Sequence, residues 1–279
     1  MLALHKQSRT ETDGKTRDDF PRLPAGVQVD AQEDRSAEPE DSAGLDLAQA
    51  LALREQAMGI LGHELRNPLS AIAILARGTM RREDLPDDVR ERLVQVDRAA
   101  QRSLAMIDSL LDFSESRWRG TLPVREVPTQ LAAISEDVVE ELRAANPGRV
   151  IALDVRSRSH TTVDPLRIGQ VLSNLVSNAL VHGFPHTPVQ VTIDVLEGEA
   201  VIVVENQGPA IAPERVASLF EPFVQGSGAQ PRGRGTERAR GLGLGLYIVH
   251  VIVAAHGGTI TVESSAEAGT TFLVRLPQR

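Results

Sequence analysis

The residues with the clearest capacity for chemistry lie in the stretch GHELRNPLSAI, Gly62–Ile72. His63 is followed directly by Glu64, and Asn67 comes one helical turn after the histidine. Imidazole gains and loses a proton near neutral pH, so His63 could take part in a reaction. A single histidine on a helix is more often a solvated or capping residue. Its interpretation therefore depends on what the rest of the chain supplies.

A second polar set is expected on a helix that Asp164-Pro165 opens, with the aspartate at the cap. Gln170, Asn174, Asn178 and His182 follow one another at intervals of four and share one face of this otherwise apolar helix. Polar side chains are costly to bury without partners, so the face is predicted to line a ligand cavity. The asparagine oxygens suit a magnesium ion that carries phosphates.

Two glycine-containing stretches could complete such a cavity. ENQGPAI, Glu205–Ile211, leaves a predicted strand, and Gly208 would allow a planar ligand to approach the backbone. GLGLGL, Gly241–Leu246, opens a predicted helix whose first amides and positive dipole end suit phosphate. The loop before it contains four arginines and is expected to close over an anionic ligand: Arg232, Arg234, Arg238 and Arg240.

The element that positions His63 is a helix predicted over about residues 45–81. Its positions 51, 54, 58, 61, 65, 68, 72 and 75 are apolar apart from Arg54 and Pro68, so they should face a core, with His63 facing solvent. Pro68 cannot donate to the carbonyl of Glu64, and a bend or loosening is expected there.

A second amphipathic helix should start after Pro86 and run to the Gly- and Pro-containing linker Trp118–Pro128. Two antiparallel helices bury little surface by themselves, which favours a dimeric four-helix bundle. A monomeric hairpin packed on the C-terminal domain is the alternative.

In the C-terminal part, segments with the 3.6-residue apolar period of a helix alternate with segments that have the two-residue period of a strand. Helices are predicted at about 129–145, from 164 onward and at 245–256, and strands at 150–155, 189–195, 200–205, 259–263 and 270–276. This order predicts a mixed α/β sandwich with helices on one side of the sheet.

Composition narrows the function classes. The 279-residue chain has a formal charge of −8 and no cysteine, which argues against nucleic-acid binding and excludes disulfides and thiolate metal sites. No apolar run is long enough to span a membrane, and a cytoplasmic location is expected. Residues 1–44 are expected to be a disordered tail.

The motifs GHELRNPLSAI, NLVSNALVHG, ENQGPAI, LFEPF and GLGLGL occur in that order and together resemble those of bacterial sensor histidine kinases. The resemblance implies a dimerisation and histidine-phosphotransfer hairpin at residues 45–119 and a Bergerat-type ATP-binding domain at 120–279. It also implies ATP and Mg²⁺ as cofactors. The implied partners are a second copy, a response regulator and a separate sensor or receptor protein.

The resemblance also implies residue roles. His63 would accept the phosphoryl group, Glu64 would orient the imidazole and act as base, and Asn67 would position a water for regulator dephosphorylation. Asn178 would ligate Mg²⁺, and Phe220 and Phe223 would pack beneath the lid. The remaining nucleotide-binding residues would be Asn174, His182, Asn206, Gly208, Ala210, Gly241, Leu242, Gly243, Leu244 and Gly245.

The chain departs from the family pattern in three places. Asn206 and Ala210 stand where the family usually has Asp and Gly, so we expect weakened or retuned ATP affinity. Position 181 is valine where a basic residue is frequent, so His182 or the lid arginines would meet the phosphates. Two alternatives stay open: a nucleotide-binding module that is catalytically weak and modulates other kinases, and an ATPase of the chaperone or topoisomerase type.

Overall fold

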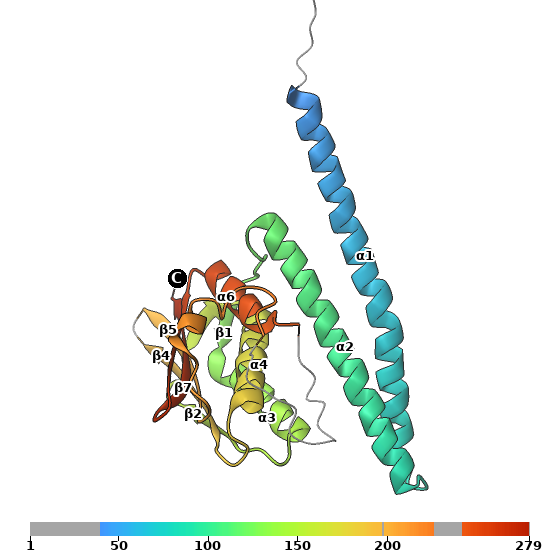
Figure 1. Ribbon diagram of the computed structural model, residues 1–279, viewed down its shortest axis with the longest axis vertical. Helices are drawn as coiled ribbons and strands as arrows, with labels where there is room; N and C mark the ends of the chain where they lie inside the picture. Colours follow the sequence, from blue (N-terminus) through green and yellow to red (C-terminus); the bar gives the residue numbers. More distant parts are fainter. Residues whose placement is uncertain (1–39, 197, 226–241, 279) are drawn as a thin grey trace, which may run out of the picture. The chain divides into compact units, whose positions relative to one another are not determined.

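The computed structural model describes residues 40–196, 198–225 and 242–278 (Figure 1). Most of the expected tail, all four lid arginines and Gly241 lie outside these residues. No helix in the described part of the chain is both long and apolar enough to cross a membrane. Residues 47–279 form one compact unit.

Two long helices form the hairpin. Helix α1 spans Glu40–Met80 and α2 spans Asp87–Arg119. Helix α2 follows Pro86, carries acids in its first turn and ends at Gly120 with a left-handed backbone, as helix-capping rules predict. Helix α1 continues through Pro68 to Met80, close to the predicted end near residue 81, and the bend or loosening expected at Pro68 stays a prediction. Proline removes one backbone donor, and the remaining bonds of a long helix keep it helical.

The two helices pack through small residues and charge pairs. A Cβ on Gly62 would collide with Leu111 of α2, and Ala73, Ala76 and Ala100 are buried. Ion pairs join Arg66 to Asp108 at 2.6 Å and Arg77 to Asp97 at 2.9 Å.

The apolar stripe predicted on α1 does not face this internal contact. Leu65, Ile72 and Leu75 are 50%, 44% and 69% exposed, and Val96 and Leu110 of α2 are exposed as well. The spacing identified an apolar face correctly, but within one chain this face has no covering element among the described residues.

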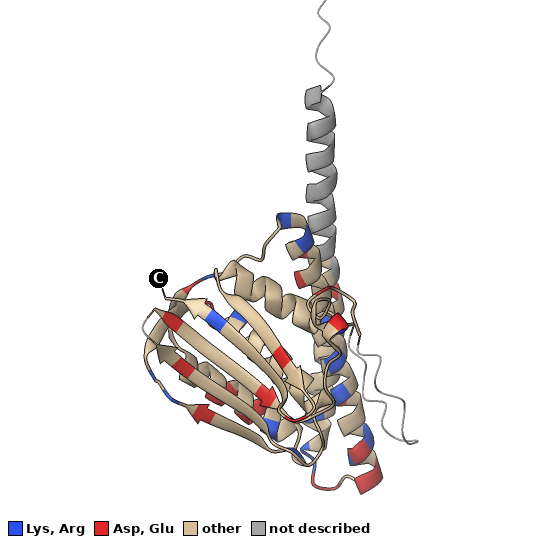
Figure 2. Ribbon diagram, turned by 60° about the vertical axis from the view of Figure 1, so that its left-hand side comes forward, with Lys and Arg blue, Asp and Glu red and all other residues tan. Residues whose placement is uncertain are grey.

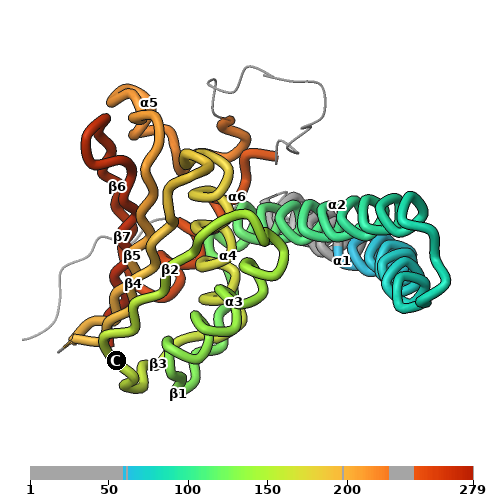
Figure 3. Tube along the Cα trace, turned by 90° about the horizontal axis from the view of Figure 1, so that it is seen from below, coloured from blue at the N-terminus to red at the C-terminus, as the bar shows by residue number. Residues whose placement is uncertain are grey.

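The C-terminal domain, which is called the catalytic domain below, is built on a five-stranded sheet in the order β2-β4-β5-β7-β6. The strands are β2 (Ile151–Val155), β4 (Val189–Leu196), β5 (Glu199–Asn206), β6 (Thr259–Ser265) and β7 (Gly269–Pro277). Strands β2 and β4 are parallel, and the other neighbours are antiparallel. Three helices cover one face (Figure 3): α3 (Leu131–Ala145), α4 (Pro165–His182) and α6 (Gly245–Ala255).

Register places the core residues in line across the sheet. Ile202 on β5 faces Ile193 on β4 and Val274 on β7, and all three are completely buried beneath the helices. Figure 2 shows charged residues along the strands, and on the uncovered face Arg275 pairs with Glu199 at 2.8 Å. Strand alternation therefore produces one apolar and one charged face.

Three short elements escaped sequence analysis. Strands β1 (Val127–Gln130) and β3 (His160–Val163) form a separate antiparallel pair, and α5 covers only Pro213–Val216.

Helix α4 begins where it was predicted to begin. The Asp164 side chain accepts hydrogen bonds from the backbone of Leu166 and Arg167, and Pro165 takes the first turn. The backbone N–H of Asp164 also donates to Nε2 of buried His256 at 3.1 Å. This bond ties the start of α4 to the end of α6, the two helices that carry the candidate nucleotide residues.

Candidate active site

His63 is exposed on α1, as its position off the apolar stripe predicts. Its Nδ1 lies 3.2 Å from Nδ2 of Asn67, so the two side chains share one face of the helix. This is the only hydrogen bond of the His63 ring among the described residues, and Nε2 is left available. Glu64 is exposed and forms no hydrogen bond with the ring in the described part of the chain.

The polar residues predicted on one face of α4 lie in two different environments. Gln170 does not line a ligand cavity as expected, because its Nε2 donates to Asp112 of α2 at 2.6 Å. Asn174 lines a pocket of about 220 Å³ together with Leu242–Gly245. Asn178 is half-buried on the following turn, and His182 is exposed at the end of the helix.

The turn after β5 lies against the end of α4. A Cβ on Gly208 would come within 2.8 Å of the carbonyl oxygen of His182, so only glycine fits there without a shift. Ala210 needs no glycine, because Phe223 is the only non-glycine residue with positive φ in the described part of the chain. The alanine therefore does not strain this loop.

Asn206 combines burial with unused hydrogen-bonding capacity. The residue is 7% exposed, and its side chain makes no hydrogen bond within the described residues. Its amide offers both a donor and an acceptor. A buried amide of this kind fits an adenine ring, which presents both partners.

The glycine loop before α6 has strict backbone requirements. Gly243 has φ +73°, and a Cβ there would lie 2.7 Å from the carbonyl oxygen of Val224. A Cβ on Gly245 would lie 3.3 Å from Oδ1 of Asn174. The first turn of α6 and the Asn174 amide thus meet around a small space, which suits the phosphates of a nucleotide.

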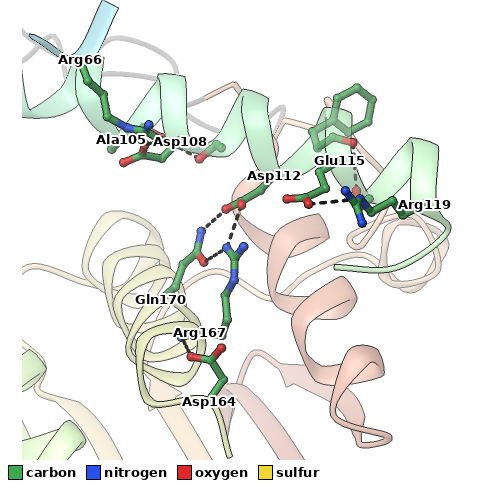
Figure 4. A network of polar contacts seen from close by, with 12 residues as sticks. Arg66, Ala105, Asp108, Asp112, Glu115, Arg119, Asp164, Arg167 and Gln170 are labelled. Atoms are coloured by element: carbon green, nitrogen blue, oxygen red, sulfur yellow. Dashed lines mark hydrogen bonds and ion pairs between the residues drawn. The ribbon is translucent and has the colours of Figure 1, made fainter. Parts of the chain in front are cut away.

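A polar network connects α2 to α4 (Figure 4). Arg167 donates to Asp112 at 2.7 Å and to Oε1 of Gln170 at 3.0 Å, and the Arg167 and Asp112 side chains are only 17% and 12% exposed. Both carboxylate oxygens of Asp112 accept a hydrogen bond, Oδ1 from Arg167 and Oδ2 from Gln170, which stabilises a largely buried charge.

Aromatic side chains extend the same contact. Phe113 of α2 meets Phe223 and Tyr247 edge to face, with ring centroids 5.0 and 5.5 Å apart. Ser116 Oγ lies 3.1 Å from the Tyr247 hydroxyl. We call these interactions of Asp112, Phe113 and Ser116 the docking contact. Sequence analysis missed it, because no local pattern links α2 to residues over fifty positions away.

The charge state of His182 responds to its surroundings. The residue is largely exposed, yet partial burial of the ring, and next the positive charge of Arg215, lower its pKa from the usual 6.5. His182 is therefore poorly suited to serve as the missing cation near the nucleotide at neutral pH.

Comparison with known families matches both halves of the chain. Residues 53–117 match the His Kinase A (phospho-acceptor) domain, and residues 163–279 match the histidine kinase-, DNA gyrase B- and HSP90-like ATPase domain. The first contains His63 and the second contains the α4, Asn206 and glycine-loop residues.

Relatives and solved structures agree with this assignment. The chain is 33% identical over 232 residues to a bacteriophytochrome of Pseudomonas aeruginosa and 33% identical over 239 residues to the probable sensor histidine kinase TcrY of Mycobacterium tuberculosis. Both alignments cover 83% of the chain, which spans 31% and 49% of these relatives.

The crystal structure of full-length ShkA in complex with AMPPNP is similar to this structure, with a TM-score of 0.60 and 26% identity. The match covers 80% of this chain and 46% of ShkA. A phosphoacceptor hairpin with an exposed histidine, followed by an ATPase domain with a glycine-lined pocket, places the chain in the family of two-component sensor histidine kinases.

Proposed function

We propose that the protein transfers the γ-phosphoryl group of ATP to His63 and then passes it to an aspartate of a response regulator. The observation that carries the proposal is the exposed His63 ring, which is held through Nδ1 by Asn67 and has Nε2 available. The same chain supplies the glycine-lined pocket beside Asn174.

In this reaction Nε2 of His63 attacks the γ-phosphorus, the P–N bond forms and the bond to ADP breaks. If the Asn67 amide turns its Oδ1 to the ring, it accepts a hydrogen bond from Nδ1–H, and the lone pair is then on Nε2. The proton that then leaves the ring is the one on Nδ1, and Glu64, directly after the histidine, would turn toward Nδ1 in place of Asn67 to receive it. The protein contributes mainly position and charge neutralisation, as in other phosphoryl transfers.

The residues present fit ATP and Mg²⁺. Asn206 would bind adenine with both its amide oxygen and its amide NH2 group. Gly208 and Ala210 would form the turn beside it, and the backbone amides of Leu242–Gly245 would bind phosphate. Asn178 would give a neutral oxygen ligand to Mg²⁺, with phosphate oxygens and water completing the shell. The described residues contain no cluster of three or more histidines or carboxylates that could hold a metal ion without the nucleotide.

Labelling with γ-labelled ATP and Mg²⁺ tests the proposal. Label should appear on the wild-type protein, resist alkali and be lost in acid, as expected of a phosphohistidine. His63→Ala should abolish labelling and keep ATP affinity, whereas the exposed control His160→Ala should label normally. Full labelling of His63→Ala would overturn the assignment, and tight ATP binding without any label would favour a catalytically weak modulator of other kinases.

A second copy of the chain is the proposed occupant of the exposed stripe on the hairpin. Leu65, Ile72 and Leu75 of α1 and Leu110 of α2 form an apolar surface that no described element covers. The match to the phosphoacceptor domain and the amphipathic pattern both favour a four-helix bundle of two hairpins. Input would reach this bundle from a separate sensor or receptor protein.

Asn67 is also proposed to support dephosphorylation of the regulator, by positioning water beside the bundle. Asn67→Ala should then slow regulator dephosphorylation by on the order of tenfold, the lower range for one positioning group. Because Asn67 also holds the His63 ring, the variant should label His63 more slowly as well. Dephosphorylation at the wild-type rate would leave the enzyme as a kinase alone.

A further inference from the structure

The pocket beside the glycine loop has a wall that the catalytic domain does not provide. One side consists of Asn174 and Leu242–Gly245, and the other side consists of α2, which contributes Arg102, Met106 and Ser109. Residues 102, 106, 109, 112, 113 and 116 lie on one face of α2 because they follow the three- and four-residue spacing of a helix. The pocket is therefore a continuation of the docking contact.

The lining of this pocket favours an anion. Gly245 starts an eleven-residue helix, so free amides and the positive end of the dipole lie at the pocket. Among the described lining residues, Arg102 is the only charged one, and no carboxylate is present.

Arg102 differs from other arginines of the hairpin. Arg66 and Arg77 pair with aspartates across the hairpin, whereas Arg102 makes no hydrogen bond or ion pair within the described residues. Its neighbours one turn away on α2 are Arg98, Ala99, Ala105 and Met106, so its own helix supplies no acid. A like charge at Arg98 is mildly unfavourable unless an anion balances it.

Among the described residues that line this pocket, those of the catalytic domain include no cation. Position 181 is valine, and the lowered pKa of His182 keeps that ring neutral at neutral pH. Within the described lining of the pocket, the hairpin is thus the source of positive charge for the phosphates.

We propose that Arg102 binds the terminal phosphate of the nucleotide while the docking contact is formed, so that the hairpin completes the nucleotide site. This inference rests on the proposed nucleotide binding and goes beyond it. Nucleotide and docking contact then strengthen each other, because coupled binding events are reciprocal. The bound phosphate, Arg102 and the Asp112–Arg167 pair together hold the domain on α2.

Binding of ADP, AMPPNP and adenosine to the full chain with Mg²⁺, measured by titration calorimetry, tests this role. Arg102→Ala should weaken ADP and AMPPNP by about tenfold, the scale of one charge-assisted hydrogen bond. Arg102→Lys should restore part of the affinity because it keeps the charge, and adenosine should bind all variants equally. Arg98→Ala, one turn away and outside the pocket, is the matched control.

A double-mutant cycle with Asp112→Ala separates the docked role from general surface charge. In the Asp112→Ala background, Arg102→Ala should weaken ADP by less than twofold, since coupled sites lose additivity. Each of three results would overturn the proposal. These are a full tenfold loss of ADP affinity from Arg102→Ala in the Asp112→Ala background, an equal loss from Arg98→Ala, and an unchanged ADP affinity of Arg102→Ala. Labelling of His63 is measured separately: nucleotide binding without label contradicts the kinase assignment alone, and normal label with unchanged affinity of Arg102→Ala contradicts the role of Arg102 alone.

Discussion

His182 packs against a neighbouring loop through its backbone, and its ring has a shifted pKa. Its carbonyl oxygen lies against Gly208 at the end of α4, and its ring lies near the charge of Arg215. Burial and that charge both disfavour the imidazolium form, so the folded protein has a lower pKa at this site than the unfolded chain.

This shift predicts a contribution of His182 to pH-dependent stability. A lowered histidine pKa means that the unfolded state binds more protons, so the contribution is complete above about pH 6.5 and is lost as pH falls below that value. His182→Gln should therefore lose less stability than the wild type between about pH 7 and pH 5. Urea unfolding midpoints of both proteins measure the difference, and parallel pH profiles would contradict the prediction.

Phe223 is the second residue whose environment outweighs its local preference. It has φ 65°, its backbone N–H donates to the carbonyl of Gly243, and its ring contacts Phe113. A bulky residue with positive φ costs about 1–3 kcal/mol and persists only where surrounding contacts impose it. The glycine loop and the docking contact together impose it here.

At the scale of elements, the docking contact depends on one buried charge pair. Asp112→Ala would leave Arg167 buried with only Gln170 as a partner, and breaking such a pair costs about 3–5 kcal/mol. The expected result is release of the catalytic domain from α2, seen as a larger radius of gyration in small-angle scattering and as faster proteolysis of the linker after Gly120.

Asp108→Ala is the matched control for that experiment. It removes a pair one turn earlier on α2 whose side chains are 42% and 47% exposed, and such pairs contribute about 0–1 kcal/mol. Equal scattering profiles for Asp112→Ala and Asp108→Ala would show that the buried pair does not hold the domain.

Local chemistry accounts for the parts of the fold that sequence predicted. The aspartate cap and proline of α4, the end of α2 at Gly120 and the alternation of β4 and β7 are each specified by neighbouring residues. Strands β1 and β3 were missed because four residues give too little periodicity, and they pair only through contacts distant in sequence.

The candidate site was predictable to the same extent. Motif spacing singled out His63, Asn174 and Asn206 as candidates, because each lies on one element with its signal nearby. It could not show that Gln170 bonds Asp112, since fifty-eight residues separate them. The helix continues past Pro68 because the rest of a long helix compensates for one missing donor.

At the scale of the whole molecule, assembly should depend on the exposed stripe of the hairpin. Leu75 is 69% exposed in the single chain, and burial against a second hairpin would stabilise the dimer by about 1.5–3 kcal/mol per large apolar side chain. Leu75→Glu should shift the protein toward monomer in analytical ultracentrifugation. Ala144→Glu, exposed on α3 away from the hairpin, should sediment like the wild type. A Leu75→Glu protein that remains fully dimeric at low concentration would place the interface elsewhere.

The docking contact also has an optical consequence. The chain contains one tyrosine and one tryptophan, and Tyr247 touches Ser116 on α2, two positions before Trp118. The excitation energy of a tyrosine is transferred efficiently to a tryptophan that is close by. When the two residues separate, the tyrosine emits this energy as its own fluorescence. Detachment of the catalytic domain from the hairpin should therefore brighten tyrosine emission and dim the sensitised tryptophan emission. The unmodified protein thus carries a donor and an acceptor on opposite sides of the surface that opens.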